Sequence, residues 1–191
     1  MTRIVAGSAR GRNLVVPRGD ATRPTSDRVR EALFSRLEHE GVVSGCRALD
    51  LFSGSGALGL EAASRGAREV WLVESAKPAL RACRRNVADL GLPGVRVVAA
   101  LVEKALSAAA EEPFDLVLLD PPYPLPEPDL DRVLRLLVSG EWLAERAVVV
   151  VERSARGPEP SWPTGMARFD QRRYGETQIW FAEPWSDNEV A

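Results

Sequence analysis

The chain has 191 residues, 45% of them hydrophobic, and a formal net charge of −2. This size and composition fit one soluble domain with a sizeable core. No apolar run approaches the roughly 20 residues of a membrane span, and the N-terminus lacks the apolar core of a signal peptide. With two cysteines and one histidine, neither a disulfide framework nor zinc or Ser-His-Asp chemistry is supported. We therefore expect a cytoplasmic protein that binds no metal.

The N-terminal part of the chain is basic. Residues 1–36 contain eight arginines and three acidic residues, a net charge of +5, whereas the remainder carries −7. A basic arm on an acidic body suits a polyanion at one end, although an ordinary solvated basic surface explains the pattern equally well.

Residues 1–41 predict a hairpin followed by a helix. Two strand-like runs flank a turn with two glycines, and they comprise residues 3–6 and 12–16. After Pro24, either Thr25 or Ser26 can cap a helix. Apolar residues at i, i+4 and i+8 from Val29 indicate an amphipathic helix that ends at Gly41.

From residue 42 the chain alternates strands and helices, which predicts an α/β, Rossmann-like fold with a mostly parallel, doubly wound sheet. The expected parallel strands are Cys46–Phe52, Glu69–Glu74, Val95–Ala99, Phe114–Leu119 and Ala147–Glu152. The expected helices between them are Leu58–Arg65, Lys77–Leu90, Glu103–Ala110 and Leu130–Ser139. Residues 167–174 and 177–182 predict a terminal antiparallel hairpin. We expect a basic extension (1–41), a main domain (42–183) and a flexible tail (184–191).

A glycine-rich loop follows the first expected strand. Gly54, Gly56 and Gly59 form G-x-G-x-x-G, and Glu74 ends the next strand 20 residues after Gly54. This context is typical of a nucleotide-binding unit, in which glycines admit a ligand close to the backbone. Asp50 precedes the loop, where a carboxylate would repel a pyrophosphate but suit an amino group and a sulfonium. The charge therefore favours S-adenosylmethionine over a dinucleotide.

Asp120, Pro121, Pro122 and Tyr123 follow the fourth expected strand. A carboxylate, two rigid prolines and an aromatic ring form a suitable clamp for a flat base with an exocyclic amine. These four residues alone are equally compatible with a proline-rich turn. In a doubly wound sheet, however, the first and fourth strands are neighbours, so this loop and the glycine loop should face one crevice.

With these motifs the chain resembles the class I methyltransferases and, within them, the bacterial 16S rRNA guanine-N2 methyltransferases. Residues 50–59, Glu74 and 120–123 carry the resemblance to the class. The narrower family rests on four further blocks: 3–7, 10–12, 23–34 and 174–177. The resemblance covers residues 3–183 and implies S-adenosylmethionine as the cofactor and 16S rRNA, free or in an assembling small subunit, as the partner. We also expect a monomer, since a basic arm on a compact domain needs no partner subunit.

The resemblance also implies roles for individual residues. The catalytic loop would be Asp120, Pro121, Pro122 and Tyr123. The cofactor would contact Asp50, Phe52, Gly54, Gly56, Glu74, Ala100 and Leu101. In the family, an acidic or amide residue usually follows the third strand, but this chain has none there. Backbone groups near Ala100 and Leu101 would therefore hold the adenine. RNA phosphates would be bound by Arg3, Arg10, Arg12, Arg23, Arg28 and Arg30, although an ion pair between Arg28 and Asp27 is an alternative.

Other functions remain open at this point. An adenine-N6 or protein-amide methyltransferase would share both central motifs. An NAD-dependent oxidoreductase would share the glycines but would have no use for residues 120–123. A non-catalytic RNA-binding module would explain the basic arm but not the cofactor crevice.

Overall fold

The computed structural model describes residues 2–17, 26–122 and 125–185. Its strands are β1 (Arg47–Leu51), β2 (Glu69–Glu74), β3 (Val95–Ala99), β4 (Phe114–Leu119), β5 (Leu143–Ser154), β6 (Met166–Tyr174) and β7 (Thr177–Pro184). Its helices are α1 (Asp27–His39), α2 (Ala57–Ser64), α3 (Lys77–Leu90), α4 (Val102–Ala105) and α5 (Glu127–Ser139). Within the described ranges the strands form one seven-stranded sheet, in the order β3-β2-β1-β4-β5-β7-β6.

The sheet is parallel from β3 to β5 and becomes antiparallel at β7 and β6. This confirms the expected fold class, including the C-terminal hairpin. Strand β5 is longer than expected at both ends, since it begins at Leu143, opposite Phe114 of β4, and continues to Ser154, opposite Thr177 of β7.

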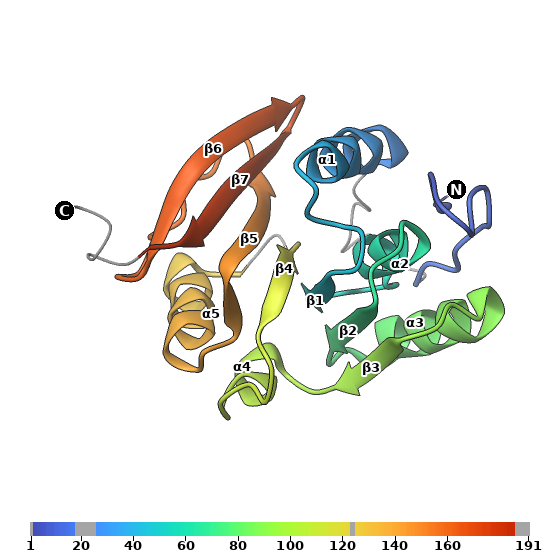
Figure 1. Cartoon of the computed structure of the whole chain (residues 1–191), viewed down its shortest axis with the longest axis horizontal. Coiled ribbons are helices and arrows are strands. Elements are labelled where there is room, and N and C mark those ends of the chain that lie inside the picture. Colours follow the sequence, from blue (N-terminus) through green and yellow to red (C-terminus); the bar gives the residue numbers. More distant parts are fainter. Residues whose placement is uncertain (1, 18–25, 123–124, 186–191) are drawn as a thin grey trace.

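Two hydrophobic layers enclose the sheet. Side chains of α1, α2 and α3 pack in one cluster, and those of α4 and α5 pack in the other; Figure 1 shows these helices on opposite faces. In β4, Leu116 and Leu118 join the first cluster while Val117 and Leu119 join the second. Successive strand residues point to opposite faces, which explains why residues 116–119 of this central strand are all apolar.

Residues 2–17, here called the N-terminal arm, reverse direction as expected but do not form two strands. One antiparallel bridge joins Arg3 and Asn13, with a hydrogen bond from the Ile4 N–H to the Arg12 carbonyl (2.9 Å). The N–H groups of Val5 and Ala6 instead donate to a side chain of α2. The predicted hairpin is therefore present, since the Gly11 N–H also donates to the Ile4 carbonyl and the Leu14 N–H to the Thr2 carbonyl (2.8 Å each), but its two runs pair through one bridge and not as regular strands.

Helix α1 begins and ends as expected. The Ser26 hydroxyl accepts a hydrogen bond from the Val29 N–H (3.3 Å), which selects Ser26 as the cap. Gly41 follows the helix with φ +72°, a conformation that glycine adopts at little cost.

Helix α4 is shorter than the predicted 103–110. It ends at Ala105, and the following segment is held by the end of α5: the Trp142 ring N–H donates to the Ala108 carbonyl, and Ala110 donates to Gly140. Pro184, placed in the tail by the sequence, belongs to β7; residues 186–191 lie outside the described part. Among the described residues no helix is both long and apolar enough to cross a bilayer.

Candidate active site

The glycine loop (residues 53–56) and the Asp120 loop (residues 120–122) leave adjacent strands at the same edge of the sheet. Strands β1 and β4 pair in parallel, with Leu51 opposite Leu119. The next residues along each strand therefore enter the two loops side by side. This confirms the predicted neighbourhood of the first and fourth strands and places both motifs at the switch point, where open α/β sheets bind ligands.

Asp50 caps helix α2 from the neighbouring strand. It is 1% exposed, and its Oδ2 accepts a 2.8 Å hydrogen bond from the Gly59 N–H. The helix begins after Gly56, which provides no side-chain cap. The Asp50 carboxylate therefore takes up one of the free backbone N–H groups at the positive N-terminal end of the helix. A dinucleotide pyrophosphate would need such donors, and a carboxylate here works against it.

The second oxygen of Asp50 is buried without a partner. Its Oδ1 has no hydrogen bond to any described residue. The pKa of this carboxyl is raised to about 7, mainly by burial and to a lesser extent by the nearby charge of Glu74, while the hydrogen bond from Gly59 lowers it. A buried acceptor without a donor is unfavourable, so the site fits a ligand that brings an amino group or positive charge. S-adenosylmethionine meets this requirement.

Glu74 holds the glycine loop against the end of β2. Its Oε2 accepts from the Gly54 N–H (2.9 Å), and its Oε1 accepts from the N–H groups of Ser75 and Ala76 (2.7 Å each). A carboxylate offers about four acceptor sites, so three are taken. About one site is left for a further donor such as a ribose hydroxyl.

The loop itself has a backbone that side chains rarely allow. Phe52 is half-buried with φ +61°, and Gly54 and Gly56 have φ +57° and +83°. A non-glycine residue in this region costs energy and is characteristic of functional sites. Helix α2, which follows the loop, packs closely against β2 at Gly59, where an added Cβ would lie 2.3 Å from the Leu72 Cδ2.

At the end of β3, one of the backbone groups expected to hold the adenine is already engaged within the fold. The Ala100 N–H already donates to the carbonyl of Glu74 (3.1 Å). Leu101 is 61% exposed and directly precedes α4, so it presents apolar surface after the end of β3.

The Asp120 loop is braced from behind. Asp120 is half-buried, Pro121 is buried and Pro122 is exposed; Tyr123 lies outside the described residues. The Pro122 carbonyl accepts from the Leu125 N–H (2.9 Å), and Arg153 of β5 donates to the Leu125 carbonyl (3.1 Å). The same arginine pairs with Glu127. Sequence reasoning missed Arg153, which is one arginine among 23 and has no motif around it.

Four of the six predicted RNA-binding arginines are exposed, namely Arg3, Arg10, Arg12 and Arg28. Arg23 lies outside the described residues. Arg12 donates to the Asp89 carbonyl at the end of α3 (2.7 Å). The suggested pair of Arg28 with Asp27 is wrong, because that carboxylate pairs with Arg30 and Arg3.

The structure contradicts the assignment of Arg30 to RNA. Its side chain is fully buried, lies 3.6 Å from the carboxylate of Glu61 and donates to the Arg3 carbonyl. A guanidinium inside the protein cannot reach a phosphate, so Arg30 attaches the arm to the main domain. Helix periodicity accounts for the error, since Arg28 and Arg30 point to opposite faces.

Glu61 and Asn86, which the sequence analysis did not single out, fasten the arm. The buried Glu61 accepts from the N–H groups of Val5 (2.8 Å) and Ala6 (2.9 Å), and pairs with Arg65. Asn86 bonds to Val15 and to the Ser55 carbonyl of the glycine loop. Each is a polar residue on an otherwise buried helix stripe, and that was the signal available in the sequence.

Metal and thiol chemistry find no support in the described part of the chain. No group of three or more His, Cys, Asp or Glu side chains there is arranged to hold a metal. Both cysteines are free and buried, and burial raises the pKa of each thiol to about 12. They are therefore neutral packing residues at physiological pH.

Comparison with known proteins agrees with this geometry. Residues 2–183 match the family described as Conserved hypothetical protein 95. Ribosomal RNA small subunit methyltransferase D of Escherichia coli K12 is 36% identical over 176 residues, which is 91% of this chain and 85% of the relative. Putative rRNA methyltransferase YlbH of Bacillus subtilis is 34% identical over 180 residues, or 93% and 96% of the two chains.

A solved structure, putative methyltransferase yhhF from Escherichia coli, superposes with a TM-score of 0.84 at 33% identity, covering 96% of this chain and 97% of that one. The match thus extends over the N-terminal arm, the sheet and the C-terminal hairpin together. The chain belongs to the Conserved hypothetical protein 95 family, the family of ribosomal RNA small subunit methyltransferase D, and has its class I methyltransferase fold.

Proposed function

We propose that this protein transfers a methyl group from S-adenosylmethionine to the exocyclic N2 amine of a guanine in 16S ribosomal RNA. The main support for S-adenosylmethionine as the cofactor is the buried Asp50, whose Oδ2 caps α2 and whose Oδ1 has no partner among the described residues. The rRNA substrate is supported by the relatives named for ribosomal RNA methylation. The choice of guanine N2 rests on the family resemblance.

The cofactor would be held by the glycine loop, with Asp50 facing its positive end, Glu74 a ribose hydroxyl, and Leu101 the adenine. When bound, it supplies an electrophilic methyl group on a sulfonium. Phe52 and Gly54 shape the loop around it. The residues of this chain then have to bring the amine into line with that methyl group.

Guanine N2 is a weak nucleophile because its lone pair is delocalised into the ring. Asp120 accepts one amine hydrogen and the Pro121 carbonyl accepts the other, which draws the nitrogen towards a tetrahedral geometry. Asp120 also takes up the proton that the nitrogen releases after methyl transfer. Tyr123 stacks on the base, and positioning supplies much of the rate acceleration.

We propose that residues 1–41 act as the RNA-binding extension, with Arg3, Arg10, Arg12, Arg23 and Arg28 on phosphates. Exposure supports this for the described members of the set. We also propose that the enzyme is monomeric. We further propose that it is cytoplasmic, which agrees with its two free cysteines. The substrate is then either free rRNA or an assembling subunit.

The decisive experiment is methyl transfer from labelled S-adenosylmethionine to 16S rRNA, free and in small subunits, followed by digestion to nucleosides. N2-methylguanosine is the expected product. N6-methyladenosine, or transfer to protein only, would support the rival methyltransferase class instead. Binding of NAD in place of S-adenosylmethionine in calorimetry would contradict the cofactor.

The role of Asp120 is tested by Asp120→Ala. We expect unchanged cofactor affinity and a loss of about 10²–10⁴-fold in methyl transfer. Glu145→Ala, which removes an exposed carboxylate on β5, serves as the matched control and should retain full activity. Near-wild-type turnover by the Asp120 variant would remove this residue from the reaction.

A further inference from the structure

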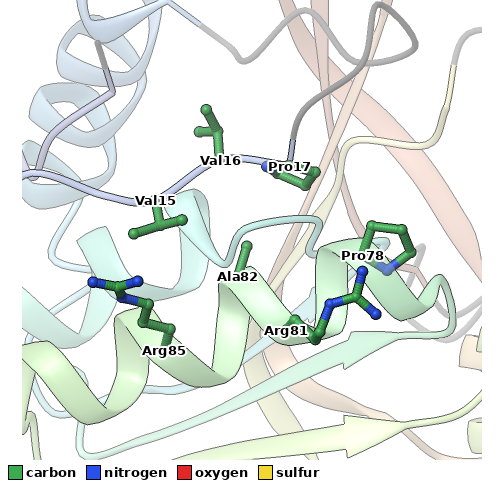
Figure 2. Close-up of a pocket in the computed structure, with 7 residues that line it drawn as sticks. All are labelled: Val15, Val16, Pro17, Pro78, Arg81, Ala82 and Arg85. Atoms are coloured by element: carbon green, nitrogen blue, oxygen red, sulfur yellow. The ribbon is translucent and has the colours of Figure 1, made fainter.

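A surface groove lies between the N-terminal arm and helix α3, outside the residues assigned to the reaction. One wall is formed by Val15, Val16 and Pro17, and the other by α3, with Pro78, Arg81 and Arg85. Figure 2 shows the arm segment running above the helix, with both arginines on the helix side. The volume of about 440 Å³ falls within the range of roughly 300–1,000 Å³ that is usual for ligand sites.

The arm wall exposes apolar surface. Val15 and Val16 are 38% and 40% exposed. Adjacent apolar side chains that remain in solvent indicate a contact surface for a ligand or partner. Together with Pro17 they offer an uncharged face to a base or sugar.

The helix wall carries positive charge. Lys77, Arg81 and Arg85 recur at i, i+4 and i+8 and all are exposed. Arg81 forms no ion pair with any described residue. Arg85 lies 3.4 Å from Asp89, but both side chains are more than half exposed, so water and salt weaken that pair. An apolar face opposite a row of cations is complementary to a nucleotide, which has an uncharged base and an anionic phosphate.

The groove is held at a fixed place beside the cofactor crevice. Asn86, on the inner side of α3, bonds to both backbone groups of Val15 (2.8 Å each) and to the Ser55 carbonyl (2.9 Å). At the other wall, Pro78 comes four residues after Glu74. A chain lying in the groove would therefore pass the edge of the crevice in which the target base is methylated.

We propose that this groove binds single-stranded RNA, taking a nucleotide that neighbours the target guanine, with its base against Val15 and Val16 and its phosphate between Arg81 and Arg85. The inference rests on the proposed function and adds a second RNA contact, on α3, to the arginines of the arm. The arm and α3 then grip the RNA from two sides, and the base that enters the crevice is selected by its neighbour.

The test is the double charge reversal Arg81→Glu/Arg85→Glu, assayed with protein-free 16S rRNA and with a short labelled single-stranded oligoribonucleotide. The matched control is Arg132→Glu/Arg135→Glu on α5, on the opposite face of the sheet, where Arg135 pairs with Asp131 at the same spacing of four residues as Arg85 with Asp89. We expect the groove variant to raise the KM for rRNA at least about tenfold and to flatten the salt dependence of oligonucleotide binding by about one unit in log–log slope. The kcat and the S-adenosylmethionine affinity should stay within about twofold of wild type, as removal of pure binding requires.

Val16→Glu, which changes the other wall without touching an arginine, should raise the same KM. Equal KM values in the groove and control variants would overturn the groove while leaving methyl transfer by the wild type intact. A wild type that transfers no methyl to 16S rRNA would instead overturn the proposed function, and the groove with it. A dimer dissociated by the groove variant, or a loss of thermal stability without change in KM, would show that a second copy or residues 18–25 of the same chain occupy the groove.

Discussion

Asn86 and Val15 exchange two hydrogen bonds of 2.8 Å, although 71 residues separate them in the sequence. The amide side chain acts as a strand would, accepting from the Val15 N–H and donating to its carbonyl. It also donates to the Ser55 carbonyl. One buried side chain thus joins the arm that we expect to hold RNA to the loop that we expect to hold the cofactor.

The substitution Asn86→Ala should therefore weaken the attachment of both the N-terminal arm and the glycine loop. It leaves one backbone N–H and two carbonyls without their partner, at a cost of about 1–3 kcal/mol in the free energy of unfolding. Urea denaturation measures this cost, and the KM for rRNA should rise as well. Asn13→Ala, at an exposed position on the arm, is the control. Equal stabilities of the two variants would mean that the Asn86 bonds contribute nothing.

The stability of the free protein should depend on Asp50 between about pH 4 and 7. Its folded-state pKa is about 7, against about 4 in an unfolded chain. In this window the folded state keeps a proton that the unfolded state has released, so stability falls as pH rises, by roughly 4 kcal/mol at most. Asp50→Asn should remove this contribution. Thermal unfolding of both proteins at pH 5 and pH 8 should show that the Tm of the variant, relative to that of the wild type, is higher at pH 8 than at pH 5.

Cofactor binding should show the opposite trend. A positively charged ligand favours the ionised Asp50, so the affinity for S-adenosylmethionine should rise from pH 6 to 8, and binding near pH 6 should release a proton. Calorimetry in two buffers of different ionisation enthalpy measures that proton. Its absence in wild type, or an equal release by Asp50→Asn, would show that Asp50 does not face the bound cation.

Gly54 of the glycine loop and Gly59 of α2 should both lower the stability of the fold on substitution, but for different reasons. In Gly59→Ala the new Cβ would lie 2.3 Å from Leu72 and 3.0 Å from Val70. The clash, about 1–3 kcal/mol, outweighs the gain of up to about 1 kcal/mol in helix propensity. In Gly54→Ala the nearest atom is 4.0 Å away and the cost is the positive φ, about 1–2 kcal/mol. Far-ultraviolet circular dichroism should detect a lower Tm for both, and a higher Tm for Gly59→Ala would refute the packing argument.

Substitution of Arg28 should affect RNA binding, whereas substitution of Arg30 should affect the stability of the fold. Arg28→Ala should weaken rRNA binding in filter assays with little change in unfolding, since the side chain is exposed. Arg30→Met should lower stability by about 3–5 kcal/mol, because it leaves the buried Glu61 facing one cation fewer. If Arg28→Ala proves the less stable of the two variants, the assignment of these arginines is reversed.

The sequence alone determined the sheet and the neighbourhood of the two loops that follow β1 and β4. Strand and helix periods are local properties, and β2, β3 and β4 begin and end where those periods predict. The adjacency of the loops at Asp50 and Asp120 followed from the connection rule for parallel strands. Both results need only short-range patterns and one general rule of topology.

Tertiary structure alone decided how the arm is attached and which arginines face solvent. Glu61 reaches back 56 residues to Val5, and Asn86 reaches back 71 residues to Val15. No local pattern encodes a hydrogen bond across such a separation. Arg28 and Arg30 read alike in the sequence, and only the packing of α1 against α2 buries one and exposes the other, because a charge inside the protein persists only where a second element brings its partner.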